Sequence, residues 1–207
     1  MDIKPEQSME EAILEMVEKL FLEKGYALTS TTEIAKAVGC NQALVHYYFR
    51  TKENLFNHIF ENKFKQFFKK IFEINHLEEL SFLDKLKHII ESHFDLLQEN
   101  PKMPFLIFNE LARQPEQLEI LKEKLHIYPE QLFAQLNGEL QMEIKAGRVR
   151  EISFMDLLIT VLSLNISLFM LLPVAGNLLE LNEEQKQGML NHRRAENVSF
   201  ILNSLRP

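Results

Sequence analysis

Residues 29–55 read TSTTEIAKAVGCNQALVHYYFRTKENL, and this stretch predicts two short helices joined by a tight turn. Ile34 and Ala35 lie on the first helix and Val45 lies on the second, at positions where apolar residues mark packed faces. Gly39 stands between the helices and tolerates the positive φ that a tight turn requires. Two helices that cross steeply around such a turn form a helix-turn-helix, which is the arrangement that we predict here.

Helical periodicity continues on both sides of this stretch. Ser8 and Glu11 have the spacing of a capping box, and they precede an apolar stripe that continues to Phe21 and stops at Gly25. Ser30 and Glu33 have the spacing of a second capping box, and polar caps also stand at the starts of three later helices, at Ser81, Ser153 and Asn182. We expect long helices over residues 9–24, 51–75, 81–100, 153–173 and 182–205, with shorter ones over 31–38, 42–49 and between 102 and 146. No alternating strand pattern appears in the sequence, so the predicted fold is all-α with about nine helices.

Composition excludes several classes of protein. The net charge is −7, and residues 1–56 carry six lysines and arginines against nine acidic residues. Any surface for nucleic acid must therefore be a local patch. The single cysteine, Cys40, excludes an intrachain disulfide framework and fits a reducing compartment. The N-terminus shows no apolar signal segment, so we expect a cytoplasmic protein.

A strongly apolar stretch without charge, LLITVLSLNISLFMLL, stands at residues 157–172, directly before Pro173. It contains threonine, serine and asparagine, and it is shorter than the roughly 20 residues that span a bilayer. We interpret it as a helix that is buried on two faces, and we expect no membrane partner.

The second helix of the predicted helix-turn-helix would present its first turns to base edges in the major groove of DNA. Gln42 suits adenine, whereas Ala43 and Leu44 suit a thymine methyl group. Tyrosine hydroxyls and helix N-termini are common phosphate contacts. Val45 and Phe49 should face the core instead. The predicted DNA contacts are Ser30, Thr31, Thr32, Gln42, Ala43, Leu44, His46, Tyr47, Tyr48 and Lys52.

The same stretch resembles the DNA-binding domain of the TetR family of bacterial one-component transcriptional regulators. The family pattern of IA, then G, then YYF or YHF, then K and L is matched at Ile34-Ala35, Gly39, Tyr47-Tyr48-Phe49, Lys52 and Leu55. His46 stands where family members very often have tyrosine, and Gln42 where the first turn often carries lysine or arginine. The N-terminal arm, which is often basic in the family, contains only Lys4. The resemblance implies a DNA-binding domain over residues 1–52 and a helical regulatory domain over residues 53–207.

The resemblance also implies what the regulatory domain does. The last two helices would pack against their symmetry mates as a four-helix bundle, which places two recognition helices ~34–36 Å apart on a palindromic operator. The middle helices would enclose a small effector, and their side chains suit a largely apolar ligand as well as an ordinary core. The candidate lining residues are His93, Phe94, Leu97, Met103, Phe105, Phe108, Asn109, Phe133, Met142, Asn165, Phe169 and Met170.

No catalytic, cofactor or metal motif stands out in the sequence. His88 and His93 are five residues apart, which is not the spacing of four that shares a metal on one helix face. We therefore predict a transcriptional regulator and not an enzyme: a homodimeric repressor that a small, largely apolar ligand releases from its operator. The alternative is a helical ligand- or protein-binding dimer that has lost sequence-specific DNA binding, and the acidic N-terminal region keeps it open.

Overall fold

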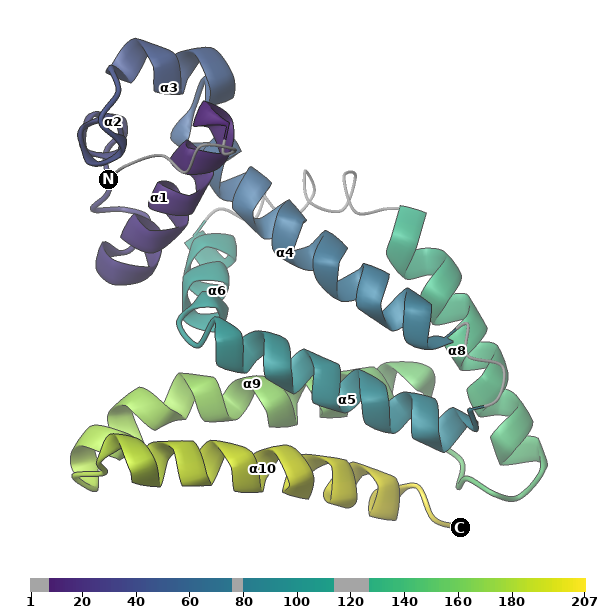
Figure 1. Cartoon of the computed structure of the whole chain (residues 1–207). Coiled ribbons are helices and arrows are strands. Elements are labelled where there is room, and N and C mark those ends of the chain that lie inside the picture. Colours follow the sequence, from purple (N-terminus) through teal and green to yellow (C-terminus); the bar gives the residue numbers. More distant parts are fainter. Residues whose placement is uncertain (1–7, 76–79, 114–126) are drawn as a thin grey trace. The chain divides into compact units, whose positions relative to one another are not determined.

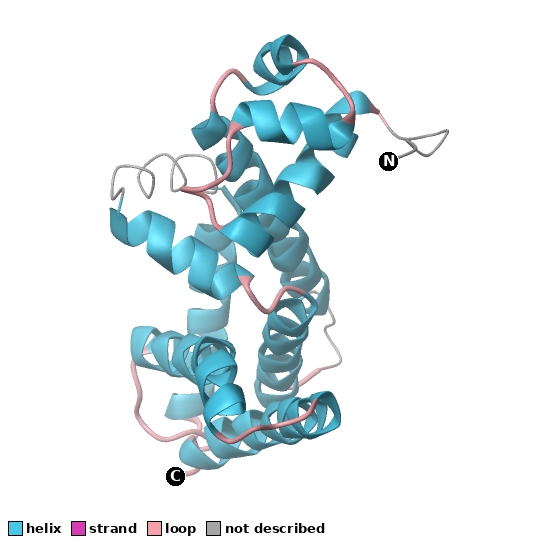
Figure 2. Cartoon of the chain, turned by 90° about the vertical axis from the view of Figure 1, so that its left-hand side faces the viewer, coloured by secondary structure: helices cyan, strands magenta, loops and turns pink. Residues whose placement is uncertain are grey.

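The structure is a computed structural model, and it describes residues 8–75, 80–113 and 127–207. Helix is the regular secondary structure of these residues, which contain no strand (Figure 2). Lys4 lies outside them. The helices are α1 (Met9–Lys24), α2 (Thr31–Val38), α3 (Gln42–Phe49), α4 (Lys52–Asn75), α5 (Phe82–Glu99), α6 (Met103–Arg113), α8 (Ile127–Lys145), α9 (Phe154–Leu178) and α10 (Glu183–Ser204). The prediction of an all-α fold with about nine helices is confirmed for the described part of the chain.

Side-chain caps account for the starts of these helices. The Ser8 hydroxyl accepts the Glu11 N–H and the Glu11 carboxylate accepts the Ser8 N–H, which confirms the predicted capping box. The prediction of a second capping box was wrong in one of its two bonds: the Ser30 hydroxyl accepts the Glu33 N–H at 3.1 Å, but the Glu33 carboxylate pairs with Lys24. The hydrogen bond from Lys24 holds the pKa of Glu33 below its ordinary value. Glu33 therefore ties the start of α2 to the end of α1.

The chain divides into two compact units, which are described separately. The first unit contains Met1–Lys65 and Phe105–Leu125, and the second contains Gln66–Pro104 and His126–Pro207. The divisions fall inside α4 and α6. The domain boundary that the sequence places between residues 52 and 53 stays a prediction.

Aromatic rings join the helices of the first unit. The Tyr26 ring lies 5.2 Å from that of Phe21 on α1 and 5.6 Å from that of Phe56 on α4, measured between ring centroids. Phe49, at the end of α3, contacts His58 of α4 at 5.4 Å. Such edge-on and tilted pairs add to the free energy of apolar burial. They hold the two ends of the helix-turn-helix against α1 and α4.

The second unit is organised around α5, which lies beside α9 and α10 (Figure 1). Arg194 of α10 donates two hydrogen bonds to Asp95 of α5, at 2.7 and 2.9 Å, and one to Glu91 at 3.1 Å. The bonds from Arg194 lower the pKa of Asp95. Lys85 of α5 donates to Glu139 of α8 at 2.9 Å. The main core beneath these pairs consists of Phe82, Leu86, Ile90, Leu140, Val149, Leu157, Val161, Val198, Ile201 and Leu205.

α9 continues past the proline at which we expected it to end. The prediction of an end near Pro173 was wrong, because the helix runs to Leu178. Pro173 is exposed and has no N–H to donate to the preceding turn, so the helix continues past it with one backbone hydrogen bond fewer. By length and composition α9 could cross a membrane, and 22% of its most apolar window is buried within the chain. Much of its apolar surface is therefore left uncovered.

Candidate DNA-binding site

α3 turns two apolar residues inward. Val45 and Phe49 are 1% and 2% exposed, which confirms the prediction that they face the core. Tyr47 is 77% exposed, and Leu44 is half-buried. Five residues of α3 are exposed: Gln42, Ala43, His46, Tyr47 and Tyr48. The helix thus presents most of its predicted DNA contacts to solvent.

Gln42, the first residue of α3, is hydrogen-bonded to α2 and to its own helix. Thr32 Oγ1 donates to Gln42 Oε1 at 3.0 Å, and Gln42 Nε2 donates to Thr31 Oγ1 at 3.0 Å. Gln42 Nε2 also lies 3.3 Å from His46 Nε2, and His46 Nδ1 lies 2.8 Å from the Arg50 carbonyl oxygen. Four predicted DNA contacts are therefore gathered into one group, which we call the Gln42 clasp.

Ser30 uses its hydroxyl at the start of α2. As the N-cap it accepts the Glu33 N–H, so the hydroxyl is engaged in starting the helix. The positive end of the α2 dipole points toward the same place, which favours an anion there. A contact between Ser30 and a DNA phosphate stays a prediction.

Lys52 has a structural role that the sequence did not indicate. Its Nζ donates to the backbone oxygens of Tyr26 and Thr29, each at 3.0 Å, and lies 4.2 Å from the centre of the Tyr26 ring. These contacts, which we call the Lys52 clamp, tie the first turn of α4 to the loop between α1 and α2. The side chain is half-buried, and its predicted contact with a phosphate stays a prediction.

Tyr26 is held beside the clamp by an acidic partner. Its hydroxyl donates to Glu53 Oε1 at 3.0 Å. Burial raises the pKa of Tyr26, and Glu53 raises it further. The pKa of Glu53 is lowered, first by a hydrogen bond from its own backbone N–H and then by Tyr26. The phenol therefore stays protonated and the carboxylate stays ionised, which keeps the bond between them at neutral pH.

Removal of the Lys52 ammonium should destabilise the protein. We expect Lys52→Ala to lower the free energy of unfolding by about 2 kcal/mol, because two charge-assisted hydrogen bonds to backbone oxygens and a cation–π contact are lost. Urea unfolding followed by circular dichroism measures the change. Lys36→Ala, which removes an exposed lysine from α2, is the matched control and should change stability by less than about 0.5 kcal/mol. Equal effects of the two substitutions would argue against the clamp.

Three of the candidate effector residues form a small core of the second unit. Phe94, Leu97 and Phe169 are buried together, and the rings of Phe94 and Phe169 lie 5.2 Å apart. Half-buried Phe133 contacts Phe68 of α4 at 6.1 Å and Phe154 of α9 at 5.7 Å, again between centroids. Met103 is buried and Met170 is half-buried. Phe94, Leu97 and Phe169 therefore pack as an ordinary core, which is the alternative that the sequence also allowed.

The polar candidates His93 and Asn165 belong to a buried chain of hydrogen bonds. Asn165 is 0% exposed, and its Nδ2 donates to the Ile90 carbonyl at 2.9 Å and lies 3.2 Å from His93 Nδ1. Asn197, also 0% exposed, donates to Asn165 Oδ1 at 2.9 Å and accepts from Arg193 at 2.7 Å. Burial lowers the pKa of His93 to about 4, which keeps its ring neutral and able to accept. We call this chain the asparagine ladder, and it joins α5, α9 and α10.

Four other candidate effector residues are exposed or half-buried. Phe105 and Phe108 on α6 are 63% and 68% exposed, and Met142 on α8 is 65% exposed. Asn109 is half-buried and donates to the Glu110 carboxylate at 3.3 Å. The predicted lining of an effector site therefore stays a prediction.

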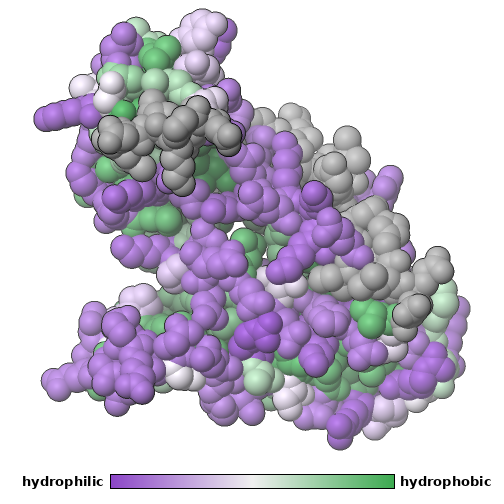
Figure 3. Space-filling model, in the orientation of Figure 1, coloured by the Kyte–Doolittle hydropathy of each residue, from purple (hydrophilic) through white to green (hydrophobic). Residues whose placement is uncertain are grey.

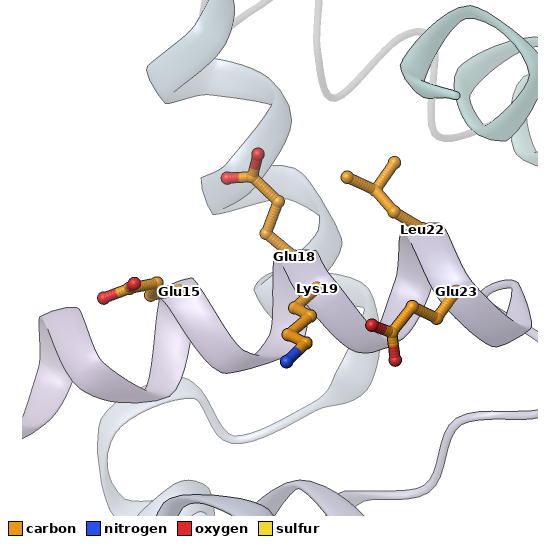
Figure 4. Close-up of a pocket in the computed structure, with 5 residues that line it drawn as sticks. All are labelled: Glu15, Glu18, Lys19, Leu22 and Glu23. Atoms are coloured by element: carbon orange, nitrogen blue, oxygen red, sulfur yellow. The ribbon is translucent and has the colours of Figure 1, made fainter. Parts of the chain in front are cut away.

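A shallow hollow on α1 has the wrong chemistry for an apolar effector. Its volume is about 390 Å³, and it is lined by Glu15, Glu18, Lys19, Leu22 and Glu23 (Figure 4). Glu18 is paired with Lys63 of α4 at 2.9 Å. Three carboxylates and one apolar residue on a single helix favour solvent over an apolar ligand.

The exposed face of α9 is unusually apolar. Hydrophilic side chains cover most of the face of the molecule in Figure 3, with smaller hydrophobic patches between them. On α9, Met155, Ile159 and Val174 are 59%, 53% and 69% exposed. Positions 155, 159, 170 and 174 follow the spacing of one helix face. This face is opposite the one that carries buried Leu157 and Val161.

Comparisons with known proteins find a family match over the helix-turn-helix. The family model for bacterial regulatory proteins of the tetR family matches residues 13–59, which contain α2 and α3. The fatty acid metabolism regulator protein of Bacillus subtilis is 28% identical over 144 residues, which cover 67% of this chain and 70% of that protein.

Solved structures show the same fold along the chain. The TetR family transcriptional regulator PfmR from Thermus thermophilus superposes with a TM-score of 0.71 at 20% identity, over 97% of this chain and 99% of that one. The fatty acid degradation regulator FadR from Bacillus halodurans superposes with a TM-score of 0.70 at 20% identity, over 98% of this chain and 99% of that one. Regulators of the TetR family bind DNA operators and small effectors and form dimers. The family match at the helix-turn-helix, the curated relative and the shared all-α fold together support the TetR family of bacterial regulatory proteins for this chain.

Proposed function

We propose that the chain is a cytoplasmic homodimeric repressor that reads a palindromic operator with α3 and leaves it when an acyl compound binds. The observation that carries the proposal is the orientation of α3. Buried Val45 and Phe49 anchor the helix, while Gln42, Ala43 and Tyr47 face solvent with groups that suit bases and phosphates.

The proposed dimer interface is the exposed face of α9 together with α10. Exposed apolar side chains at Ile159, Val174 and Phe200 give this surface a reason to be covered. Gly188 and Ala195 of α10 are small and exposed, and they would let a second helix approach closely. A twofold axis would then place two copies of α3 on the two halves of a palindrome.

The effector class follows from two kinds of support. A relative from Bacillus subtilis and a structural neighbour from Bacillus halodurans are named for fatty acid metabolism or degradation. The apolar cluster of Phe94, Leu97 and Phe169 has the chemistry of a site for an acyl chain. Release from DNA requires that the acyl compound bind the DNA-incompetent state more tightly than the DNA-bound state.

Selection of an operator from random duplex DNA tests the proposal. We expect the wild-type protein to enrich a palindrome, and Tyr47→Ala to bind it at least about tenfold more weakly because a base or phosphate contact is lost. A saturated long-chain fatty acid and its thioester should each be titrated into the complex. At least one of them should raise the dissociation constant for DNA, as measured by fluorescence anisotropy.

Tyr47→Ala should keep the unfolding midpoint and the molecular mass of the wild type, since Tyr47 is 77% exposed. If wild-type protein enriches no sequence at low salt, the chain acts as a ligand- or protein-binding dimer instead. If an operator is found but neither acyl compound weakens the complex, the effector is of another class.

A further inference from the structure

The hydrogen bonds of the Gln42 clasp have a direction that one backbone oxygen determines. The Arg50 carbonyl can only accept, so the proton of His46 must be on Nδ1, which lies 2.8 Å away. In the neutral ring His46 Nε2 is then an acceptor, and it lies 3.3 Å from the amide nitrogen of Gln42. The same nitrogen donates to Thr31, and Gln42 Oε1 accepts from Thr32. Every bond in the clasp then has one donor and one acceptor.

The clasp changes what Gln42 offers to DNA. Both hydrogens of its amide nitrogen are used, by Thr31 and by His46, and only a lone pair on Oε1 is left. A free glutamine contacts adenine through two bonds, one donated to N7 and one accepted from the N6 amino group. A clasped Gln42 makes only the second bond. It therefore accepts equally well from the amino group of adenine or from that of cytosine.

Two features favour a clasp that persists on DNA. Release of Gln42 would leave His46 Nε2 without a donor in an interface that excludes water, which is costly. Arg50 has a φ of 61°, a conformation that non-glycine residues rarely adopt, and its carbonyl oxygen there lies within hydrogen-bond distance of His46. Unusual backbone that is held by such a contact often marks a functional site.

We propose that His46 is a positioning residue for operator recognition: by occupying one N–H of Gln42, it makes Gln42 select an exocyclic amino group, on adenine or cytosine, at one position of each half-site. This inference rests on the proposed reading of DNA by α3. It goes beyond that function by assigning a base class to one side chain and the control of that class to another.

Operator selection with four proteins tests the proposal, at a pH of about 8.5 where an ordinary imidazole is neutral. Wild type should accept adenine and cytosine at one symmetric position. His46→Phe frees one N–H of Gln42, so adenine should become favoured over cytosine by about tenfold through a two-bond contact. Gln42→Ala should lose the preference at that position. His58→Phe changes a histidine that contacts Phe49 and lies outside the clasp, and it should select like wild type.

Two results would overturn the proposal. One is an unchanged base preference in His46→Phe at the position where Gln42→Ala loses it. The other comes from nitrogen NMR of the full-length protein with labelled histidine, where the proposal requires a proton on His46 Nδ1 and a proton only on Nε2 contradicts it. The NMR measurement uses the wild-type protein without DNA, so it does not depend on whether a variant folds. If the wild-type protein selects no DNA sequence, the proposed function is wrong, and the role proposed for His46 is then wrong as well.

Discussion

A double variant, Ile159→Glu with Val174→Glu, will be monomeric at micromolar concentration, whereas the wild type will have about twice the chain mass of 24.4 kDa. Both side chains lie on the exposed apolar face of α9, at 53% and 69% exposure. In a symmetric dimer each substitution occurs twice, so the interface would have to bury four carboxylates without partners. An uncompensated buried charge costs about 3–5 kcal/mol, which weakens association a hundredfold or more. Light scattering after gel filtration measures the mass.

The control adds the same charge elsewhere. Leu28→Glu with Met142→Glu changes two residues that are 78% and 65% exposed and lie outside α9 and α10, and this variant should stay dimeric. The circular dichroism of both variants should match that of the wild type. A dimer in the α9 variant with native helix content would place the interface on another surface.

The asparagine ladder should contribute several kcal/mol to the stability of the second unit. We expect Asn165→Leu to lower the free energy of unfolding by about 3 kcal/mol, although leucine has a similar size. The substitution leaves His93 Nδ1 and an Asn197 N–H without partners in a buried place. Each unsatisfied buried group costs about 1–3 kcal/mol. Urea unfolding at one fixed protein concentration measures the loss, because the stability of a dimer depends on concentration.

Ser167→Ala provides the comparison on the same helix. Ser167 is exposed and donates only to the Leu164 carbonyl, one turn earlier, at 3.2 Å. Its loss should cost less than about 0.5 kcal/mol. A cost for Asn165→Leu as small as that for Ser167→Ala would show that the ladder specifies the packing of α9 without stabilising it.

Features that depend on a few neighbouring residues could be predicted from the sequence. Ser81, Ser153 and Asn182 each accept the backbone N–H three residues later, and each begins the helix that its spacing indicated. The inward positions Val45 and Phe49 follow equally from helical periodicity. Local hydrogen bonding and local period decide these positions, so one sequence is enough to find them.

Features that depend on distant segments could not be predicted in this way. Lys52 binds carbonyls that lie 26 and 23 residues earlier in the chain, and no local pattern distinguishes it from a lysine that faces DNA. Asn165 and His93 meet across 72 residues, so the sequence showed two polar candidates but not the bond between them. The end of α9 was also predicted wrongly. The sequence places it near Pro173, whereas the helix continues through this proline to Leu178.

The Lys52 clamp closes a loop of the chain around the helix-turn-helix. The bond from Lys52 to the Thr29 carbonyl joins the two ends of a stretch that contains α2, the turn and all of α3. Closure of a loop lowers the entropy of the chain inside it once, whatever residues the loop contains. Exposed residues of α3 can therefore be substituted without loss of the hydrogen bond that closes the loop. In the proposed repressor, the residues that determine operator specificity would all lie within this closed loop, and Lys52 would allow them to change while the rest of the fold stays the same.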